Sequence, residues 1–229
     1  MCVLAQQGYR TGIVDFTQGE LGSRGTPEQR MTEAQEAAEI LGLSARENLG
    51  LPDGNIQNTK ANQRLVIEAV RQYRPTIVLI NSLECRHPDH GDAARLSIDA
   101  LYYSGLRKIE TAAPDGTPHE PWRPHHVLHY MQAVPFEPTV VVDVSDVWQQ
   151  RIDGLQAFAS QFFNPEYEPA DDEPETYVSN PAFFEWIEAR ARTYGYSVGA
   201  TYGEPLLYHN GPFGVRDLHT ALSMEKRFR

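Results

Sequence analysis

The sequence predicts an α/β fold of the Rossmann-like type, with a mostly parallel sheet and helices on both of its faces. Two observations support this prediction. Short apolar segments rich in β-branched residues alternate along the chain with amphipathic segments of helical period. The segment TIVLINS, residues 76–82, shows no polar alternation, as expected for a strand that is covered on both faces.

The expected elements follow one another from the first residues. Residues 1–7 resemble the end of a helix, and residues 11–16 resemble a buried strand. The next helix has a strong start, because Thr26 can cap it, Pro27 suits its first position and Gln29 completes a capping box. Gly42 ends this helix. Further strands are expected at 47–51, 76–82, 125–131 and 139–145, and further helices at 65–73, after 87–90, at 148–162 and at 183–194.

The composition indicates one domain over residues 1–229. The chain is 41% hydrophobic, enough for one sizeable core, and no linker or internal repeat divides it. A net charge of -11 and a pI near 5.2 argue against a nucleic-acid-binding surface. We find no apolar run of membrane-spanning length and no signal segment. Because Cys2 and Cys85 form no disulfide framework, we expect a reducing compartment, the cytoplasm.

The segment HPDH follows directly on the strand expected at 76–82. Ligands of an open α/β sheet bind at the carboxyl ends of its strands, where His87, Asp89 and His90 would lie. One imidazole can bind zinc, a second can act as an acid or oxyanion partner, and the carboxylate can orient a ring. The simpler alternative is a strand-to-helix turn in which Asp89 caps the helix and both histidines face solvent. The segment alone leaves both interpretations open.

Other polar residues near the expected strand ends are weaker candidates. Arg30 can hold a substrate carboxylate with its guanidinium group, or simply be solvated. Glu20 and Arg24 lie in a glycine-containing loop that is equally well explained as a plain turn. His129 faces one side of its strand and is at most a wall residue of a pocket. Cys85 is either a reactive thiol or a buried inert one.

Several segments together resemble the PIG-L/LmbE family of zinc-dependent N-acetylglucosaminyl deacetylases. The resemblance covers nearly the whole chain in order. Within the family, the chain is most similar to the deacetylase of bacillithiol biosynthesis. It implies hydrolytic removal of acetate from N-acetylglucosaminyl malate. The segments that carry it are IVDFTQGELGSRGTPEQR, ARENLGLPDG, RPTIVLINSLECRHPDHGDAARL, GLRKIE, VVVDVSDVW and SQFF.

The resemblance also implies a role for each residue of HPDH. His90 becomes a zinc ligand, His87 the partner of the developing oxyanion or leaving amine, and Asp89 a supporting residue. The residues expected to bind the malyl carboxylates are Arg30, Arg86 and Arg107, and His129 is expected to line the substrate pocket. The family also implies Zn²⁺ as the cofactor and a homo-oligomeric assembly.

The sequence departs from the family pattern at its start. The family's AHPDD-type motif, which carries two further zinc ligands and the general base, is absent, and Met1 corresponds to a position inside the first family helix. We therefore expect an N-terminally truncated domain, weakly active or inactive as written, because His90 alone would hold zinc poorly. One rival is a non-catalytic protein that keeps the fold without the complete metal site. A Rossmann-type nucleotide-binding enzyme is less favoured, because the chain has no GxGxxG motif.

Overall fold

The computed structural model describes residues 1–170 and 172–221, and the chain forms two compact units. Unit 1 takes in Met1–Asp53 and Val141–Glu204, and unit 2 takes in Gly54–Val140 and the segment that starts at Pro205. The single domain expected over residues 1–229 stays a prediction.

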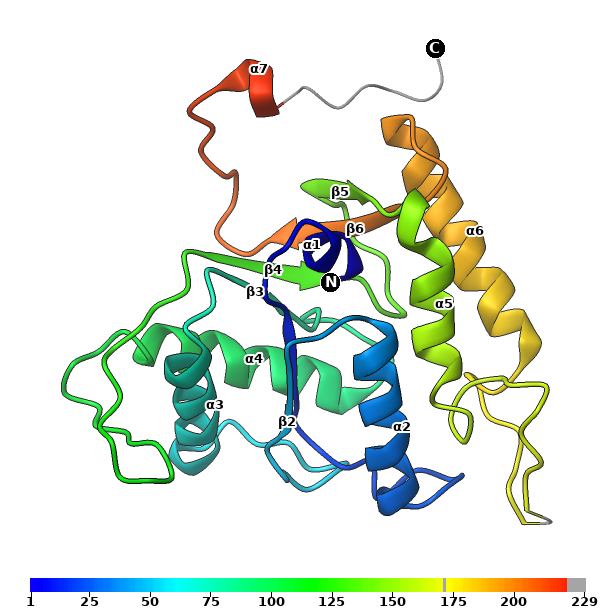
Figure 1. The fold of residues 1–229 in the computed structure, drawn as a ribbon, viewed down its shortest axis with the longest axis horizontal. Helices are drawn as coiled ribbons and strands as arrows, with labels where there is room; N and C mark the ends of the chain where they lie inside the picture. The colour runs from blue at the N-terminus through cyan, green and yellow to red at the C-terminus, as the bar shows by residue number, and fades with distance from the viewer. Residues whose placement is uncertain (171, 222–229) are drawn as a thin grey trace. The chain divides into compact units, whose positions relative to one another are not determined.

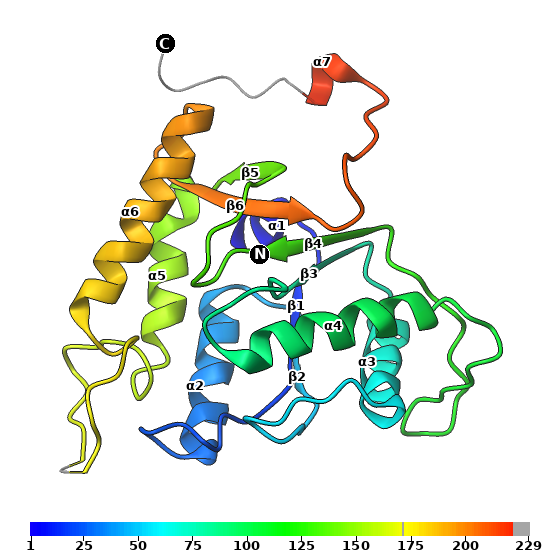
Figure 2. The same ribbon diagram turned by 180° about the vertical axis from the view of Figure 1, so that it is seen from behind.

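Unit 1 combines a two-stranded parallel sheet with helices that precede and follow it. Its elements are α1 (Cys2–Gln6), β1 (Gly12–Asp15), α2 (Pro27–Ile40), β2 (Ala45–Asn48), the 3-10 helix η1 (Ser145–Val147), α5 (Trp148–Gln156) and α6 (Pro181–Val198). Strands β1 and β2 pair in register from Gly12 opposite Ala45 to Asp15 opposite Asn48. In both views, α5 and α6 run side by side (Figures 1 and 2). Trp148 belongs to the buried core of this unit and stacks on Tyr202 with ring centroids 4.3 Å apart.

Unit 2 carries the HPDH segment between a strand and a helix. Its elements are α3 (Lys60–Tyr73), β3 (Ile77–Ile80), α4 (Pro88–Tyr103), β4 (His126–Tyr130) and α7 (Leu218–Ala221). Helices α3 and α4 pack against each other (Figure 1). The side chain of Arg71 is buried at the end of α3 and donates to the carbonyl oxygens of Ser104, Leu106 and Ile109 and to Thr111 Oγ1. This places the loop after α4 against α3.

Strands β3 and β4 belong to a four-stranded sheet of order β3-β4-β6-β5, with β5 at Val140–Asp143 and β6 at Gly203–Tyr208. β3 and β4 are parallel, with Ile80 opposite His129. β4 and β6 are antiparallel, with His129 opposite Leu207. The predicted parallel arrangement is therefore only partly confirmed, because this sheet is mixed.

The helix boundaries follow local signals in the sequence. Thr26 Oγ1 accepts from the Gln29 N–H at 3.2 Å, as expected at the start of α2. Arg74 takes a left-handed conformation, with φ at 48°, and ends α3 just before Pro75. Of the helices in the described part of the chain, none is both long and apolar enough to cross a membrane.

Two elements differ from the sequence-based prediction. α5 ends at Gln156 instead of residue 162, because Glu33 of α2 accepts from both the N–H and the hydroxyl of Ser160, each at 2.8 Å, and draws the chain out of the helix. Strand β6 was not predicted. Gly203 and Pro205 disfavour a strand, and Pro205 has no N–H to donate, so only the pairing with β4 reveals it.

Candidate active site

His87 forms the cap of helix α4. Its Nδ1 accepts from the Asp89 N–H at 3.3 Å, and Pro88 fills the first helical position, where an N–H would have no helical partner. Since Nδ1 accepts, the neutral ring carries its proton on Nε2. The exposed ring can therefore present an N–H donor to a bound molecule.

Asp89 is buried in the first turn of α4 and is held by backbone amides. Its carboxylate accepts from the Gly54 N–H at 2.7 Å and from the Ile56 N–H at 3.5 Å. Its negative charge at the helix N-terminus is also favourable. The residue contacts His87 through its backbone N–H, so the ring is oriented by capping, whereas the sequence suggested a carboxylate partner.

His90 lies half-buried in the first turn of α4, between two side chains. Its Nδ1 is 3.0 Å from Cys85 Sγ, and its Nε2 is 3.4 Å from Gln132 Nε2. Burial lowers the pKa of His90 below its usual value, and the neighbouring charge of His87 acts in the same direction. The ring is therefore neutral near pH 7, the form that can donate an electron pair.

The two arginines expected beside HPDH have different positions. Arg86 is exposed and directly precedes His87, and its charge contributes to the lowered pKa of His90. Arg107 is exposed in the turn that follows the C-terminal end of α4. At about 1.5 Å per residue, the 16 residues of α4 separate it from His87 by about 24 Å. The geometry therefore separates Arg107 from the HPDH segment, and it is not close enough to share a ligand with His87.

His129 is buried in β4 and only 3% exposed. Its Nδ1 lies 2.6 Å from the backbone oxygen of Asn81, and its Nε2 lies 3.0 Å from His209 Nδ1. Because both ring nitrogens have protein partners, the ring has none left to bind a substrate. Burial lowers the pKa of His209, and the charge of His129 adds to this effect.

Arg30 lies in unit 1, near the glycine-containing loop before α2. Its Nη2 donates to the Arg24 carbonyl at 3.1 Å, and burial lowers the pKa of its guanidinium. Among the described residues, the buried Nε atoms of Arg24 and Arg30 have no hydrogen-bond partner. Gly25, at φ of 68°, must be glycine because an added Cβ would lie 2.6 Å from Ser160 Oγ. Arg24 Nε lies 3.9 Å from Glu173 Oε2, so the loop residue Arg24 already has a charged partner, whereas the buried Nε of Arg30 in α2 has no hydrogen-bond partner among the described residues.

Glu20 and Asp53, in the same unit, are linked by two hydrogen bonds between side chain and backbone. Glu20 accepts from the Asp53 N–H at 2.8 Å, and Asp53 accepts from the Leu21 N–H at 3.1 Å. Hydrogen bonds from the backbone, that of Asp53 first, lower the pKa of Glu20. These carboxylates hold the loop in place, as turn residues do.

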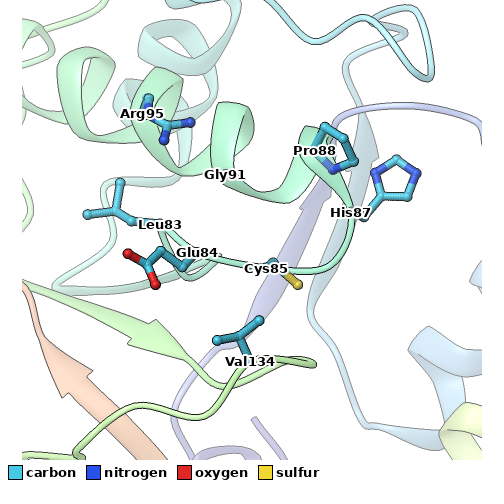
Figure 3. Close-up of a pocket in the computed structure, with 8 residues that line it drawn as sticks. All are labelled: Leu83, Glu84, Cys85, His87, Pro88, Gly91, Arg95 and Val134. Carbon is cyan, nitrogen blue, oxygen red and sulfur yellow. The ribbon is translucent and has the colours of Figure 1, made fainter.

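A pocket of about 380 Å³ lies along the start of α4. Figure 3 shows His87 beside Pro88 on one side and Leu83, Glu84 and Arg95 on the other. Gly91 permits this close approach of helix and loop, because a Cβ there would lie 2.9 Å from the Leu83 oxygen. The remaining lining residues are Cys85 and Val134.

The described residues do not fit a complete zinc site. A catalytic zinc needs three protein ligands, and within the described ranges no three His, Cys, Asp or Glu side chains come together as a candidate set. His90 offers one suitable neutral nitrogen, and Cys85 is its sulfur neighbour.

Sequence reasoning missed Asn81 and Gln132. Asn81 directly follows β3 and Gln132 follows β4 by two residues, and the Asn81 amide donates to Gln132 Oε1 at 3.1 Å. Both amides lie outside the HPDH motif. The available signal was their position, at the carboxyl ends of two strands that turn out to be parallel neighbours.

Comparison with known proteins supports the resemblance. Residues 1–101 match the PIG-L family, described as GlcNAc-PI de-N-acetylase. The chain is 30% identical over 162 residues to diacetylchitobiose deacetylase of Thermococcus kodakarensis (strain ATCC BAA-918 / JCM 12380 / KOD1). That match takes in 66% of this chain but only 56% of the relative, so it spans little more than half of the relative's length.

Solved structures share the fold over most of their length. The conserved protein TT1542 from Thermus thermophilus superposes with a TM-score of 0.79 at 34% identity, covering 94% of this chain and 88% of the other. The N,N'-diacetylchitobiose deacetylase from Pyrococcus horikoshii, solved with its inhibitor MPG, gives a TM-score of 0.73 at 20% identity, covering 96% and 80%. At that identity the second likeness shows the fold alone. The first 101 residues of the chain are therefore similar to the PIG-L family, and the likeness in fold extends over most of the chain.

Proposed function

We propose that this protein hydrolyses the acetamide of an N-acetylglucosamine conjugate, and specifically of N-acetylglucosaminyl malate, as in bacillithiol biosynthesis. Two findings support the proposal: relatives in the family are deacetylases of N-acetylated sugars, and the HPDH segment begins a helix at the end of a strand. The malate part of the proposal follows from the sequence resemblance, which assigns arginines to its two carboxylates, groups that arginine can bind.

The single observation that carries the proposal is the capped geometry of His87. Hydrolysis of an acetamide develops negative charge on the carbonyl oxygen and then needs a proton on the leaving nitrogen. The Nε2–H of His87 is directed away from its own cap bond and can donate to either atom. Asp89, fixed by the amides of Gly54 and Ile56, keeps the cap in place during the reaction.

The proposal includes zinc as the cofactor, with His90 as one ligand. We assign no step of the reaction to the metal, because the described residues do not complete its ligand set. Metal analysis of purified protein tests this part on its own. A bound zinc that is lost in His90→Gln would support it, and a zinc content unchanged by that substitution would contradict it.

The proposal is tested by measuring acetate and free amine after incubation with N-acetylglucosaminyl malate, with zinc supplied. We expect equal amounts of both products, with faster release than from N-acetylglucosamine or diacetylchitobiose. If no acetate is released from the malate conjugate or from the other two sugars, the rival is favoured, namely a binding protein that keeps the fold without catalysis. Release from diacetylchitobiose alone would keep the reaction and exclude the malate substrate. The homo-oligomeric assembly stays a prediction that light scattering of the protein can test.

A further inference from the structure

The ring of His90 is contacted on both nitrogens by side chains that no motif assigns. Cys85 Sγ lies 3.0 Å from Nδ1, and Gln132 Nε2 lies 3.4 Å from Nε2. The carboxamide of Gln132 is in turn fixed by Asn81, whose Nδ2 donates to Gln132 Oε1 at 3.1 Å. All four residues belong to unit 2 and come from the segments after β3 and β4 and from the first turn of α4.

This arrangement specifies which ring nitrogen of His90 carries the proton. The Gln132 oxygen accepts from Asn81, so its nitrogen faces the ring, and an amide nitrogen can only donate. His90 Nε2 must then accept. The single proton of the neutral ring is therefore on Nδ1, directed at Cys85 Sγ, which is a weak acceptor.

The two amide residues, Asn81 and Gln132, are linked to the buried residue His129 of β4. The backbone oxygen of Asn81 can only accept, so His129 donates to it through Nδ1 at 2.6 Å. The Nε2 of His129 then accepts from His209 Nδ1 at 3.0 Å. His129 is 3% exposed, so this support lies inside the protein and ties Asn81 to β4.

We propose that Gln132, held by Asn81, is a positioning residue that keeps His90 in the Nδ1–H tautomer, with the electron pair of Nε2 directed at the Gln132 N–H. A Lewis acid that binds His90 at Nε2 would take the place of this N–H. The inference deepens the proposed function and rests on it for any effect on activity. The tautomer itself is a property of the resting protein and can be measured without substrate.

The test is long-range ¹H–¹⁵N NMR of the imidazole nitrogens, with the His90 signals assigned by their loss in His90→Gln. In the wild-type protein we expect the Nδ1–H tautomer. In Gln132→Glu the side chain keeps its shape but can only accept, so the proton should move to Nε2. In Gln132→Met neither donor nor acceptor remains, and the two tautomers should become mixed.

Asn81→Asp gives a second, independent variant that leaves residue 132 unchanged. The new carboxylate can only accept, so the Gln132 amide should turn its nitrogen toward it and its oxygen toward His90. The proton should again move to Nε2. Backbone NMR spectra identify any variant that has lost its fold, and either of the two substitutions suffices to decide.

The proposal is overturned if the wild-type ring is the Nε2–H tautomer, or if a folded Gln132→Glu or Asn81→Asp variant leaves the tautomer unchanged. A wild-type protein without deacetylase activity would count against the proposed function only, because the NMR result does not depend on turnover.

Discussion

The loop that leads into α4 and the loop that leads into α2 both hold charged side chains, but they satisfy them differently. Before α4, the polar atoms have partners: His87 and Asp89 are bonded to backbone amides, and His90 is contacted on both ring nitrogens. Before α2, the buried Nε atoms of Arg24 and Arg30 have no hydrogen-bond partner among the described residues. The polar atoms of the first loop are held by hydrogen bonds, whereas Arg24 near the second is held by an ion pair with Glu173, at 3.9 Å. Arg30 is therefore the residue near the second loop with a buried donor that has no hydrogen-bond partner among the described residues.

The largest effect is expected from His87→Asn. Asparagine is a good helix cap, so α4 should keep its start while the Nε2–H donor is lost. We expect kcat for acetate release to fall by about 10²- to 10⁴-fold, the usual contribution of a positioned acid or base. His126→Asn, at an exposed histidine of β4, is the matched control. A similar loss in both variants, or in neither, would remove His87 from the reaction.

Arg30→Lys tests the second loop. Lysine keeps the charge but not the planar pair of donors, so KM for the malate conjugate should rise by about tenfold, with little change for uncharged diacetylchitobiose. Steady-state kinetics with both substrates measure the difference. The control is Arg10→Lys, at an exposed position of the same unit. If KM rises equally for both substrates, Arg30 supports the loop and does not bind a carboxylate.

Asp89→Asn tests whether the first loop is organised by its carboxylate. The new amide group would point a donor at one of two N–H groups, those of Gly54 and Ile56. We expect the free energy of unfolding to fall by about 1–3 kcal/mol, measured by urea titration. Asp92→Asn, which removes only an exposed ion pair with Arg95, should cost less than about 1 kcal/mol. Equal losses would show that the buried carboxylate is not the organising group.

The smallest effect concerns pH. Burial and the neighbouring His129 lower the pKa of His209 in the folded protein, so above its usual value of 6.5 the ring is neutral in both states and contributes nothing. As pH falls below 6.5, the unfolded chain binds the proton more readily and stability decreases. His90 acts in the same direction.

Urea midpoints measured at pH 8 and at pH 5.5 should therefore show a smaller decrease in His209→Gln than in the wild-type protein. The single variant His90→Gln separates the contribution of the first loop from that of the buried pair. An unchanged decrease in His209→Gln would mean that this pair does not carry the pH dependence.

The sequence allowed the boundaries with local causes to be predicted. Thr26 with Pro27 marks a helix start that the structure has at the same place. The helix expected after residues 87–90 instead begins at Pro88, because His87 caps it and Asp89 lies inside its first turn. The mixed sheet was not predictable in this way, because strand β6 has a glycine and a proline and is defined by its partner β4, far away in the chain. The local pattern of apolar and polar residues does not predict which distant segments pair as strands.

The same limit applies to the candidate site. The motif identified His87, Asp89 and His90 as a group, but their partners come from other segments: Gly54 and Ile56 for Asp89, and Gln132 for His90. Arg107 lies apart from this group for a related reason. Arg107 is only 17 residues from His90 in the sequence, but the intervening residues form the straight helix α4, which places its two ends far apart in space.

Arg71 has a consequence for how this chain tolerates change. Its guanidinium reaches four oxygen atoms in the segment 104–111, at 2.5 to 2.9 Å, from the inside of the protein. A surface connection is ordinarily the place where insertions and protease cuts are accepted, but this one is tied to the interior along its length. Arg71→Lys would leave several of these oxygens without donors. The segment 104–111, although it is a surface connection, should therefore be among the segments least tolerant of change.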